Sequence, residues 1–136
     1  MSVSEKAGRT VVFCATGIKK TKTKEYKRIV FDRVKVNECS CYDNTTGVFT
    51  TTVPGTYVFT ATVGSGKEDR RVSAWIMVDG IAYGLLCGSY KSPGSSSSVS
   101  VQLGLGQRVL VTAGNDVDEY SPLEMCFTGV LVQPQL

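Results

Sequence analysis

The chain of 136 residues contains no histidine, and this absence excludes several kinds of active site. Without an imidazole, neither a Ser-His-Asp nor a Cys-His arrangement can activate a nucleophile, and a zinc site with mixed cysteine and histidine ligands cannot form. No helix is predicted, so no glycine-rich phosphate loop precedes one. The paired carboxylates Glu68 and Asp69 lie in a predicted turn and not in a recognisable cleft. The sequence therefore predicts that the protein is not an enzyme.

Long apolar runs are absent as well. No run approaches the ~20 residues that a transmembrane helix needs, so we expect no membrane insertion. Residues 1–10, MSVSEKAGRT, lack the apolar segment of a signal peptide, which fits either a cytosolic protein or a secreted domain without its leader. No Gly-X-Y repeat of a collagen stalk is present. A hydrophobic content of 42% predicts one globular domain with a core of its own.

Cysteine occurs in an odd number, and the five residues are Cys14, Cys39, Cys41, Cys87 and Cys126. In a secreted protein an odd count leaves at least one thiol free or paired between chains. The first close pair has one intervening residue, which does not match the CxxC spacing of a zinc site. We expect mostly free, partly buried cysteines that pack as small hydrophobic side chains, and the sequence leaves their disulfide state open.

Helical periodicity is missing, because no segment keeps an apolar period near 3.6 and no capped helix is evident. Alternation is present instead, most clearly in residues 56–63, where Tyr57, Phe59 and Ala61 share one face. Asp79-Gly80 is a strong hairpin signal. The serines at 95–98 merge into an alternating segment and are read as the start of a strand. The expected strands are 11–15, 26–31, 32–38, 48–52, 56–63, 70–78, 81–87, the segment that follows the serines, 108–113 and 124–132.

The connections between these strands complete the fold prediction. Residues 37–43 are predicted as a loop that holds two cysteines, and residues 114–122 as an acidic loop. Eight to ten short strands with turn signals between them indicate a β-sandwich or barrel, and a jelly roll fits the mixed strand lengths best. The strand faces carry more apolar side chains than one small sandwich core needs, and such a surplus is typical of an interface.

Positive charge is concentrated in a basic segment, residues 19–28, in which only Glu25 opposes the cations. Clustered lysines attract phosphate, sulfate or carboxylate groups, so lipopolysaccharide, a sulfated glycan or nucleic acid is a candidate ligand. Nucleic acid ranks last, because Tyr26 is the one aromatic residue among the lysines. The alternative is a solvated loop that aids solubility. The candidate ligand-binding residues are Lys19, Lys20, Lys22, Lys24, Lys27 and Arg28.

Negative charge gathers in the acidic loop, since residues 81–115 contain no carboxylate at all. The second group of candidate ligand-binding residues is Asp116, Asp118, Glu119 and Tyr120. Their carboxylates could contact a ligand or hold a peripheral cation, and the alternative is a charged surface turn. Asn44 begins the sequence Asn-Thr-Thr, which is a glycosylation sequon, although turn geometry also explains an asparagine there.

A series of short motifs occurs in a fixed order along residues 10–133. The motifs are Phe31-Asp32, Asn37, Tyr42-Asp43, Thr46-Gly47, Phe49, Val53-Pro54-Gly55, Tyr57-x-Phe59, Asp79-Gly80, Ser96-Ser97, Leu103, Gly106-x-x-Val109 and Phe127-x-Gly129-x-Leu131. Each is weak alone, but together and in this order they resemble the signature of complement C1q globular domains.

The resemblance implies an all-β, ten-stranded jelly roll of the C1q and tumour-necrosis-factor type that assembles as a homotrimer. It implies an N-terminal extension at residues 1–9 and a globular domain at 10–136. In such a fold the first and last strands are neighbours, so Cys14 and Cys126 would lie close together. Many relatives hold calcium with carboxylates in the loop that corresponds to residues 85–98. That loop has none here, so no calcium cofactor is expected.

The resemblance also suggests a function. Stand-alone C1q-domain proteins of invertebrate type resemble lectin-like molecules of innate immunity. We therefore expect a secreted pattern-recognition module that binds microbial or anionic surface ligands through exposed loops, with trimerisation raising a weak affinity. One alternative is a cytokine-like ligand that engages a protein receptor, by analogy with the tumour-necrosis-factor fold. Another is a structural trimerisation domain.

Overall fold

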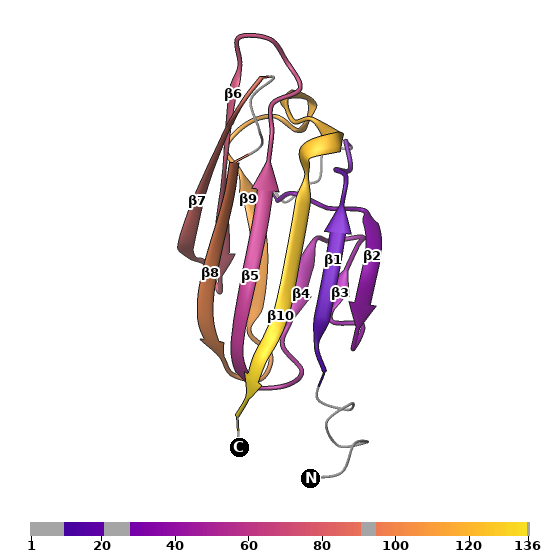
Figure 1. The fold of residues 1–136 in the computed structure, drawn as a ribbon, viewed down its shortest axis with the longest axis vertical. Coiled ribbons are helices and arrows are strands. Elements are labelled where there is room, and N and C mark those ends of the chain that lie inside the picture. The colour runs from indigo at the N-terminus through magenta and orange to yellow at the C-terminus, as the bar shows by residue number, and fades with distance from the viewer. Residues whose placement is uncertain (1–9, 21–27, 91–94, 136) are drawn as a thin grey trace.

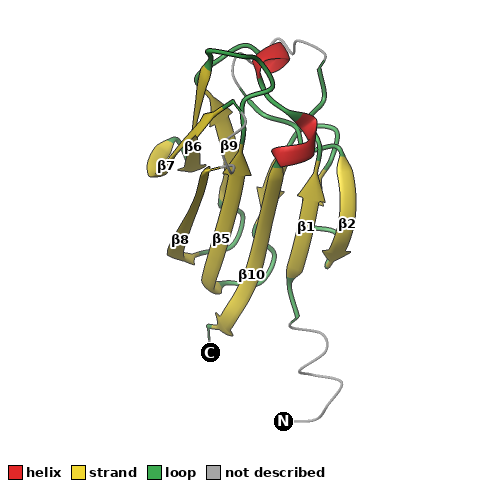
Figure 2. Ribbon diagram, turned by 45° about the horizontal axis from the view of Figure 1, so that its top comes forward, coloured by secondary structure: helices red, strands yellow, loops and turns green. Residues whose placement is uncertain are grey.

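The computed structural model describes residues 10–20, 28–90 and 95–135. Two five-stranded antiparallel sheets pack face to face (Figures 1 and 2). Sheet A has the order β2-β1-β10-β5-β8 and sheet B the order β3-β4-β9-β6-β7. The prediction of a ten-stranded jelly roll is confirmed. The strands are β1 (Val12–Thr16), β2 (Arg33–Glu38), β3 (Tyr42–Asp43), β4 (Val48–Thr50), β5 (Gly55–Val63), β6 (Arg71–Val78), β7 (Ile81–Ser89), β8 (Ser95–Leu103), β9 (Arg108–Ala113) and β10 (Cys126–Pro134).

Aromatic rings fill the space between the sheets. Phe13 lies among them, stacked on Tyr42 at 5.0 Å and meeting Phe127 edge-on at 5.0 Å between ring centroids. Large flat side chains supply much buried area for each strand position, which suits strands that contribute few inward residues each. Gly129 lies opposite Phe59, and a Cβ at this position would overlap the rings of Phe13 and Phe59. The alternation predicted for residues 56–63 is confirmed.

One predicted loop is partly strand. In residues 37–43, β2 continues to Glu38 and Tyr42–Asp43 forms β3. The cause is Tyr42, whose hydroxyl donates to Phe31 O at 2.8 Å while its ring is buried. The strand predicted at residues 81–87 is confirmed and extends to Ser89 as β7, and β8 begins at Ser95, so most of the region that corresponds to the family's 85–98 loop is strand.

The serine run is held in β8 by a ladder of hydroxyls. Ser96 bonds to Thr62 at 2.6 Å, and Ser98 bonds to Thr60 at 2.8 Å, across the pair of strands β5 and β8. Cross-strand Ser and Thr pairs of this kind stabilise a sheet although neither residue is apolar. The interpretation of the serines as the start of a strand is therefore confirmed.

The strand predicted at residues 26–31 does not form within the described residues, which begin again at Arg28. Arg28 makes one isolated bridge to Thr112, and Ile29 donates its backbone N–H to Val111 O at 2.8 Å. The next backbone bond goes to a different partner, from Lys19 N to Val30 O. The segment is thus buried between elements without pairing along one strand. The expectation that Ile29 and Phe31 point inward holds, since both are fully buried.

Turns and short helices complete the architecture. Asp79 and Gly80 have φ angles of 45° and 82°. A type I′ hairpin requires a positive φ at both of its central positions, so the predicted hairpin is confirmed. Two 3₁₀ helices, η1 (Val117–Glu119) and η2 (Pro122–Glu124), precede β10 and were not predicted, because a three-residue helix shows no periodicity. No helix in the described part of the chain is long and apolar enough to cross a membrane.

The cysteines divide into one bonded pair and three thiols. Cys39 and Cys41 form a disulfide, whereas Cys14, Cys87 and Cys126 are free. Cys14 lies opposite Thr128 on β10, and only Phe127, whose side chain points inward, separates Thr128 from Cys126 along that strand. The expected closeness of the Cys14 and Cys126 thiols is therefore confirmed. Burial raises the pKa of Cys126 to about 11, and the neighbouring Cys14 thiol raises it further.

Candidate ligand-binding surface

Loops that are far apart in the sequence meet at one end of the sandwich, opposite the start of β1 and the end of β10 (Figure 1). Gly66 donates its N–H to Glu119 O at 2.8 Å, and Ser121 donates to Gly64 O at 2.9 Å. Gly17 donates to Met125 O at 3.3 Å, which brings in the segment that follows β1. We call this surface, formed by residues 17–20, 64–71 and 114–124, the loop end.

Lys20 joins the basic segment to the acidic loop. Its ammonium donates to two backbone carbonyls of the acidic loop, Val117 O at 2.6 Å and Tyr120 O at 2.8 Å. Partial burial lowers the pKa of Lys20, the Asp118 carboxylate opposes this shift, and the nearby Lys67 adds to it. The sequence placed these two loops in separate regions, and the structure brings them together. Lys20 thus positions η1 more than it offers charge to a ligand.

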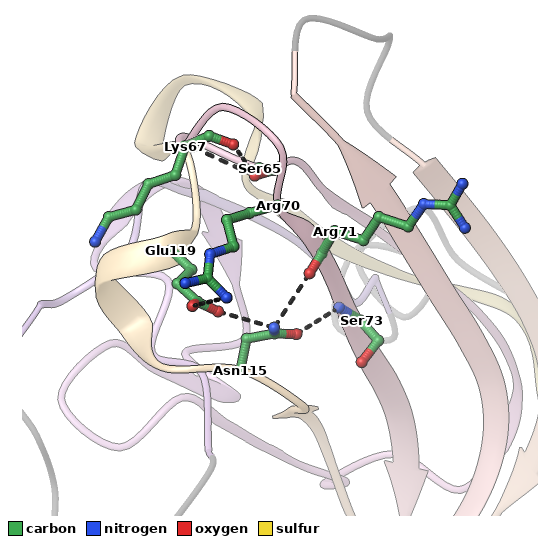
Figure 3. A network of polar contacts seen from close by, with 7 residues as sticks. All are labelled: Ser65, Lys67, Arg70, Arg71, Ser73, Asn115 and Glu119. Atoms are coloured by element: carbon green, nitrogen blue, oxygen red, sulfur yellow. Dashed lines mark hydrogen bonds and ion pairs between the residues drawn. The ribbon is translucent and has the colours of Figure 1, made fainter.

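Glu119 also has a structural partner set (Figure 3). One carboxylate oxygen lies 3.9 Å from the Arg70 guanidinium, and the other accepts from Asn115 Nδ2 at 2.8 Å. Asn115 in turn donates to Arg71 O at 3.2 Å and accepts from Ser73 N at 2.9 Å. One amide side chain therefore links the acidic loop to the start of β6, and Glu119 orients that amide.

Tyr120 lies in the core, with only 1% of its surface exposed. Its hydroxyl donates to Ser73 O at 2.6 Å, and burial raises its pKa to about 12. The structure therefore removes Tyr120 from the residues that could contact a ligand at the surface. It acts as an anchor that fixes the end of the acidic loop to β6.

The remaining predicted site residues are spread over the surface. Lys19, Asp116 and Asp118 are exposed at the loop end, and Arg28 is half-buried beside β9. The other three residues of the basic segment fall outside the described residues and stay predictions; they are Lys22, Lys24 and Lys27. Asn44 is exposed in the turn between β3 and β4, where its amide donates to Asp32 O at 3.3 Å.

A groove of about 440 Å³ opens beside the hydrogen-bond network of Asn115 and Glu119, and the sequence does not predict this groove. Its described lining residues are Glu68, Asp69, Arg70, Arg71, Ser89 and Tyr90. The two carboxylates that were expected in a turn outside any cleft therefore lie at the edge of one. In Figure 3 the Arg71 guanidinium points away from the Asn115 network. A predicted turn reveals the exposed charges, but only the packing of β6 beside β7 shows that they line a concave surface.

Positive and negative side chains alternate over the loop end. Its described cations are Lys19, Lys20, Lys67, Arg70 and Arg71, and its described carboxylates are Glu68, Asp69, Asp116, Asp118, Glu119 and Glu124. Within residues 10–20, 28–90 and 95–135, no three acidic, cysteine or histidine side chains gather in a way that could hold a metal ion. The expectation that the protein needs no calcium or other cofactor stays a prediction.

A second surface lacks charge entirely. Four adjacent strands of sheet A, β1, β10, β5 and β8, contain no acidic or basic residue, and Val130 and Val132 on this sheet are 43% and 60% exposed. The edge strand β7, which lies beside β8, is also uncharged. It exposes Ile81, Tyr83 and Leu85 by 62%, 47% and 56%. Such an uncharged face is typical of a surface that a partner covers.

The sequence profile of the C1q domain matches residues 12–132. The chain belongs to the C1q domain family. Domains of this family form trimers, bind ligands or receptors, are typically secreted and are generally not enzymes. No curated protein sequence matches this chain significantly.

Solved structures support the same fold. The globular domain of the zebrafish complement 1qA protein has a TM-score of 0.72 and 18% identity, covering 93% of this chain and 99% of that one. Murine APRIL at pH 8.0 has a TM-score of 0.72 and 11% identity, covering 90% of this chain and 99% of that one. The Eiger TNF of S. frugiperda has a TM-score of 0.69 and 11% identity, covering 94% and 96%. At these identities the likeness concerns the fold alone.

Proposed function

We propose that this C1q domain is a secreted, homotrimeric recognition module that binds microbial or other surface ligands bearing anionic groups through its loop end. The supporting observation is the convergence of residues 19–20, 67–71 and 116–119 at the end of the sandwich opposite the start of β1 and the end of β10. Exposed cations there, next to a groove, can contact phosphate, sulfate or carboxylate groups. Within this set, Lys19, Lys67 and Arg71 contact the ligand, and Lys20, Glu119 and Tyr120 position the loops.

The uncharged face of sheet A and the apolar edge β7 support the proposed trimer. A lysine in the middle of this face, introduced as Thr60→Lys, would place an unpaired charge in the subunit interface. We expect the unchanged chain to sediment at three times 14.6 kDa and the variant to sediment near 14.6 kDa. Thr50→Lys, at an exposed position of β4, is the matched control and leaves the trimer intact. Sedimentation of the unchanged chain as a monomer contradicts the proposal.

The ligand is tested by a screen of glycans and lipopolysaccharide at two salt concentrations. Lys67→Ser combined with Arg71→Ser removes two loop-end charges, each worth roughly 0.5–1 kcal/mol at a surface, so we expect about tenfold weaker binding. The control is Lys35→Ser with Arg108→Ser, which removes the same charge from β2 and from the start of β9, away from the loop end. Equal loss in both double variants would assign the effect to net charge and not to the loop end.

The basic segment is tested separately. Lys22→Ser with Lys24→Ser leaves the structural Lys20 in place and removes charges from the part of the segment outside the described residues. If this variant loses salt-sensitive binding while the Lys67 and Arg71 variant keeps it, the basic segment and not the groove contacts the ligand. Loss in both variants indicates that one ligand spans both.

A protein receptor is the alternative partner, and the alternation of charges over the loop end favours it. Acidic and basic side chains side by side suit a protein surface with complementary charges of both signs. In that case the glycan screen is negative, and a pull-down from cell surfaces that depends on Arg71 identifies the receptor.

Secretion has its own test, because the exposed Asn44 acquires an N-glycan when the chain passes through the secretory pathway.

A further inference from the structure

The turn between β2 and β3 carries a feature that ligand recognition does not use. Cys39 and Cys41, separated by Ser40, form a disulfide. Arg33 pairs with Thr16 beside the loop end and Glu38 pairs with Val12, so the turn lies toward the opposite end of sheet A. It is therefore remote from the proposed ligand surface.

The backbone of this turn adopts a conformation that side chains disfavour. Cys39 and Ser40 have φ angles of 84° and 54°, and neither is glycine. Ser40 donates its N–H to Asn37 O at 3.2 Å, and the Asn37 amide bonds to both the N–H and the carbonyl of Tyr42. The buried Tyr42 and the disulfide together hold both residues in the left-handed region. Strained non-glycine residues of this kind are concentrated at functional sites.

The two sulfurs have different surroundings. Cys39 is exposed, whereas Cys41 is only 7% exposed. The Cys41 sulfur lies 3.2 Å from Thr52 Oγ1, and in the disulfide only the threonine hydroxyl can donate. An incoming thiolate can reach Cys39 from solvent. The departing Cys41 thiolate would keep a hydrogen bond from Thr52, which favours it as the leaving group.

We propose that the Cys39–Cys41 disulfide is a thiol-exchange site at which an external thiolate adds to Cys39. The thiolate attacks Cys39 Sγ and forms a new S–S bond, the Cys39–Cys41 bond breaks, and its electron pair passes to Cys41 Sγ. A second thiolate then releases Cys39 and leaves both cysteines reduced, while the two external thiols become one disulfide. Glutathione and a cysteine of another copy share this chemistry.

The experiment uses the full chain, folded under oxidising conditions and incubated with reduced glutathione without oxygen. After acid quenching and alkylation, peptide mass mapping locates the adduct. We expect one glutathionyl group on Cys39 with Cys41 alkylated. A disulfide-linked dimer through Cys39 on a non-reducing gel, formed without glutathione, identifies a protein thiol as the source. An adduct on Cys41, a disulfide that excess glutathione leaves intact, or two cysteines alkylated before any thiol is added overturns the proposal.

Two variants test separately the strained backbone at Ser40 and the hydrogen bond from Thr52 to the Cys41 sulfur. Ser40→Gly removes the penalty of the left-handed backbone at one residue, so the ratio of the squared concentration of reduced glutathione to the concentration of oxidised glutathione at half-reduction should rise about tenfold, or about 1.4 kcal/mol. An unchanged half-reduction point means that the turn stores no strain in the disulfide form and overturns that part. Thr52→Val removes the hydroxyl beside Cys41 and should slow the first exchange several-fold with the site of attack unchanged. An unaltered rate contradicts the leaving-group role of Cys41.

Discussion

The aromatic core and the loop end are stabilised in different ways. In the core, Phe13 contacts three neighbouring rings at centroid distances of 5.0–5.3 Å, and the contacts depend on close packing of the whole rings. At the loop end, single atoms carry the structure, because one Asn115 amide joins β6, Glu119 and the acidic loop. The core depends on volume, and the loop end depends on the direction of individual hydrogen bonds.

This difference has a functional consequence. A core that depends on volume tolerates similar apolar side chains and keeps the two sheets together whatever the loops contain. Loops held by a few directional bonds can change their exposed residues as long as the bonded ones remain. If the loop end binds a ligand as proposed, Lys19, Lys67 and Arg71 can vary with that ligand, whereas the structural roles of Lys20 and Asn115 cannot.

The largest expected effect comes from removing volume in the core. Phe13→Ala leaves a cavity among the packed rings and should lower the free energy of unfolding by about 4 kcal/mol. Urea unfolding at a fixed protein concentration measures this, since a trimer's stability depends on concentration. Phe13→Leu keeps most of the volume and should cost less than half as much. A similar cost for both variants would show that ring stacking and not volume dominates the core.

The core could be predicted because its signal is repeated along the chain. Alternation in residues 56–63 identified Tyr57 and Phe59 as inward, and both are fully buried. The serines of β8 were also recognised, because they merge into an alternating segment. The error occurred at β3, which is held by the buried Tyr42, and a hydropathy pattern does not show this contact.

A smaller effect is expected at the loop end, from Asn115→Ala. The variant leaves Ser73 N–H and Arg71 O without their partner and releases Glu119, which should cost about 2 kcal/mol. Hydrogen exchange should show faster exchange at Ser73 and in the acidic loop, with β5 and β10 unchanged. Faster exchange over the whole domain would mean that the two regions are not energetically separate.

Asn115→Asp provides the matched control for that experiment. It keeps the oxygen that accepts from Ser73 N but loses the donor to Arg71 O, and it places a second carboxylate beside Glu119. We expect a loss of stability close to that of the alanine variant. Wild-type stability in Asn115→Asp would show that the single bond to Ser73 holds the loop.

Sequence reasoning found the charges of the candidate site but not their arrangement. The basic segment and the acidic loop were recognised separately, and the bonds from Lys20 to Val117 and Tyr120 that join them span about a hundred residues. Tyr120 is predicted as a ligand-binding residue together with the acidic loop beside it, whereas its ring is buried in the core. Local composition indicates which groups are charged, and only long-range packing determines which of them remain exposed.

The smallest effect is expected at the boundary of the two regions, from Tyr120→Phe. The ring keeps its volume, and only the bond to Ser73 O is lost, which should cost about 1 kcal/mol at neutral pH.

The pH dependence of Tyr120→Phe separates the contribution of the buried ring from that of the hydroxyl hydrogen bond. Burial raises the pKa of Tyr120 from 10.0 to about 12, so the unfolded chain loses this proton more readily than the folded one. The contribution is complete below about pH 10 and is lost as pH rises through about 12. Tyr120→Phe should therefore lose less stability than the unchanged chain over this window, while Tyr42, whose pKa burial also raises, keeps part of the alkaline dependence in both. Identical alkaline slopes in urea unfolding would mean that the Tyr120 hydroxyl ionises equally in both states, and the loop end would then depend on volume as the core does.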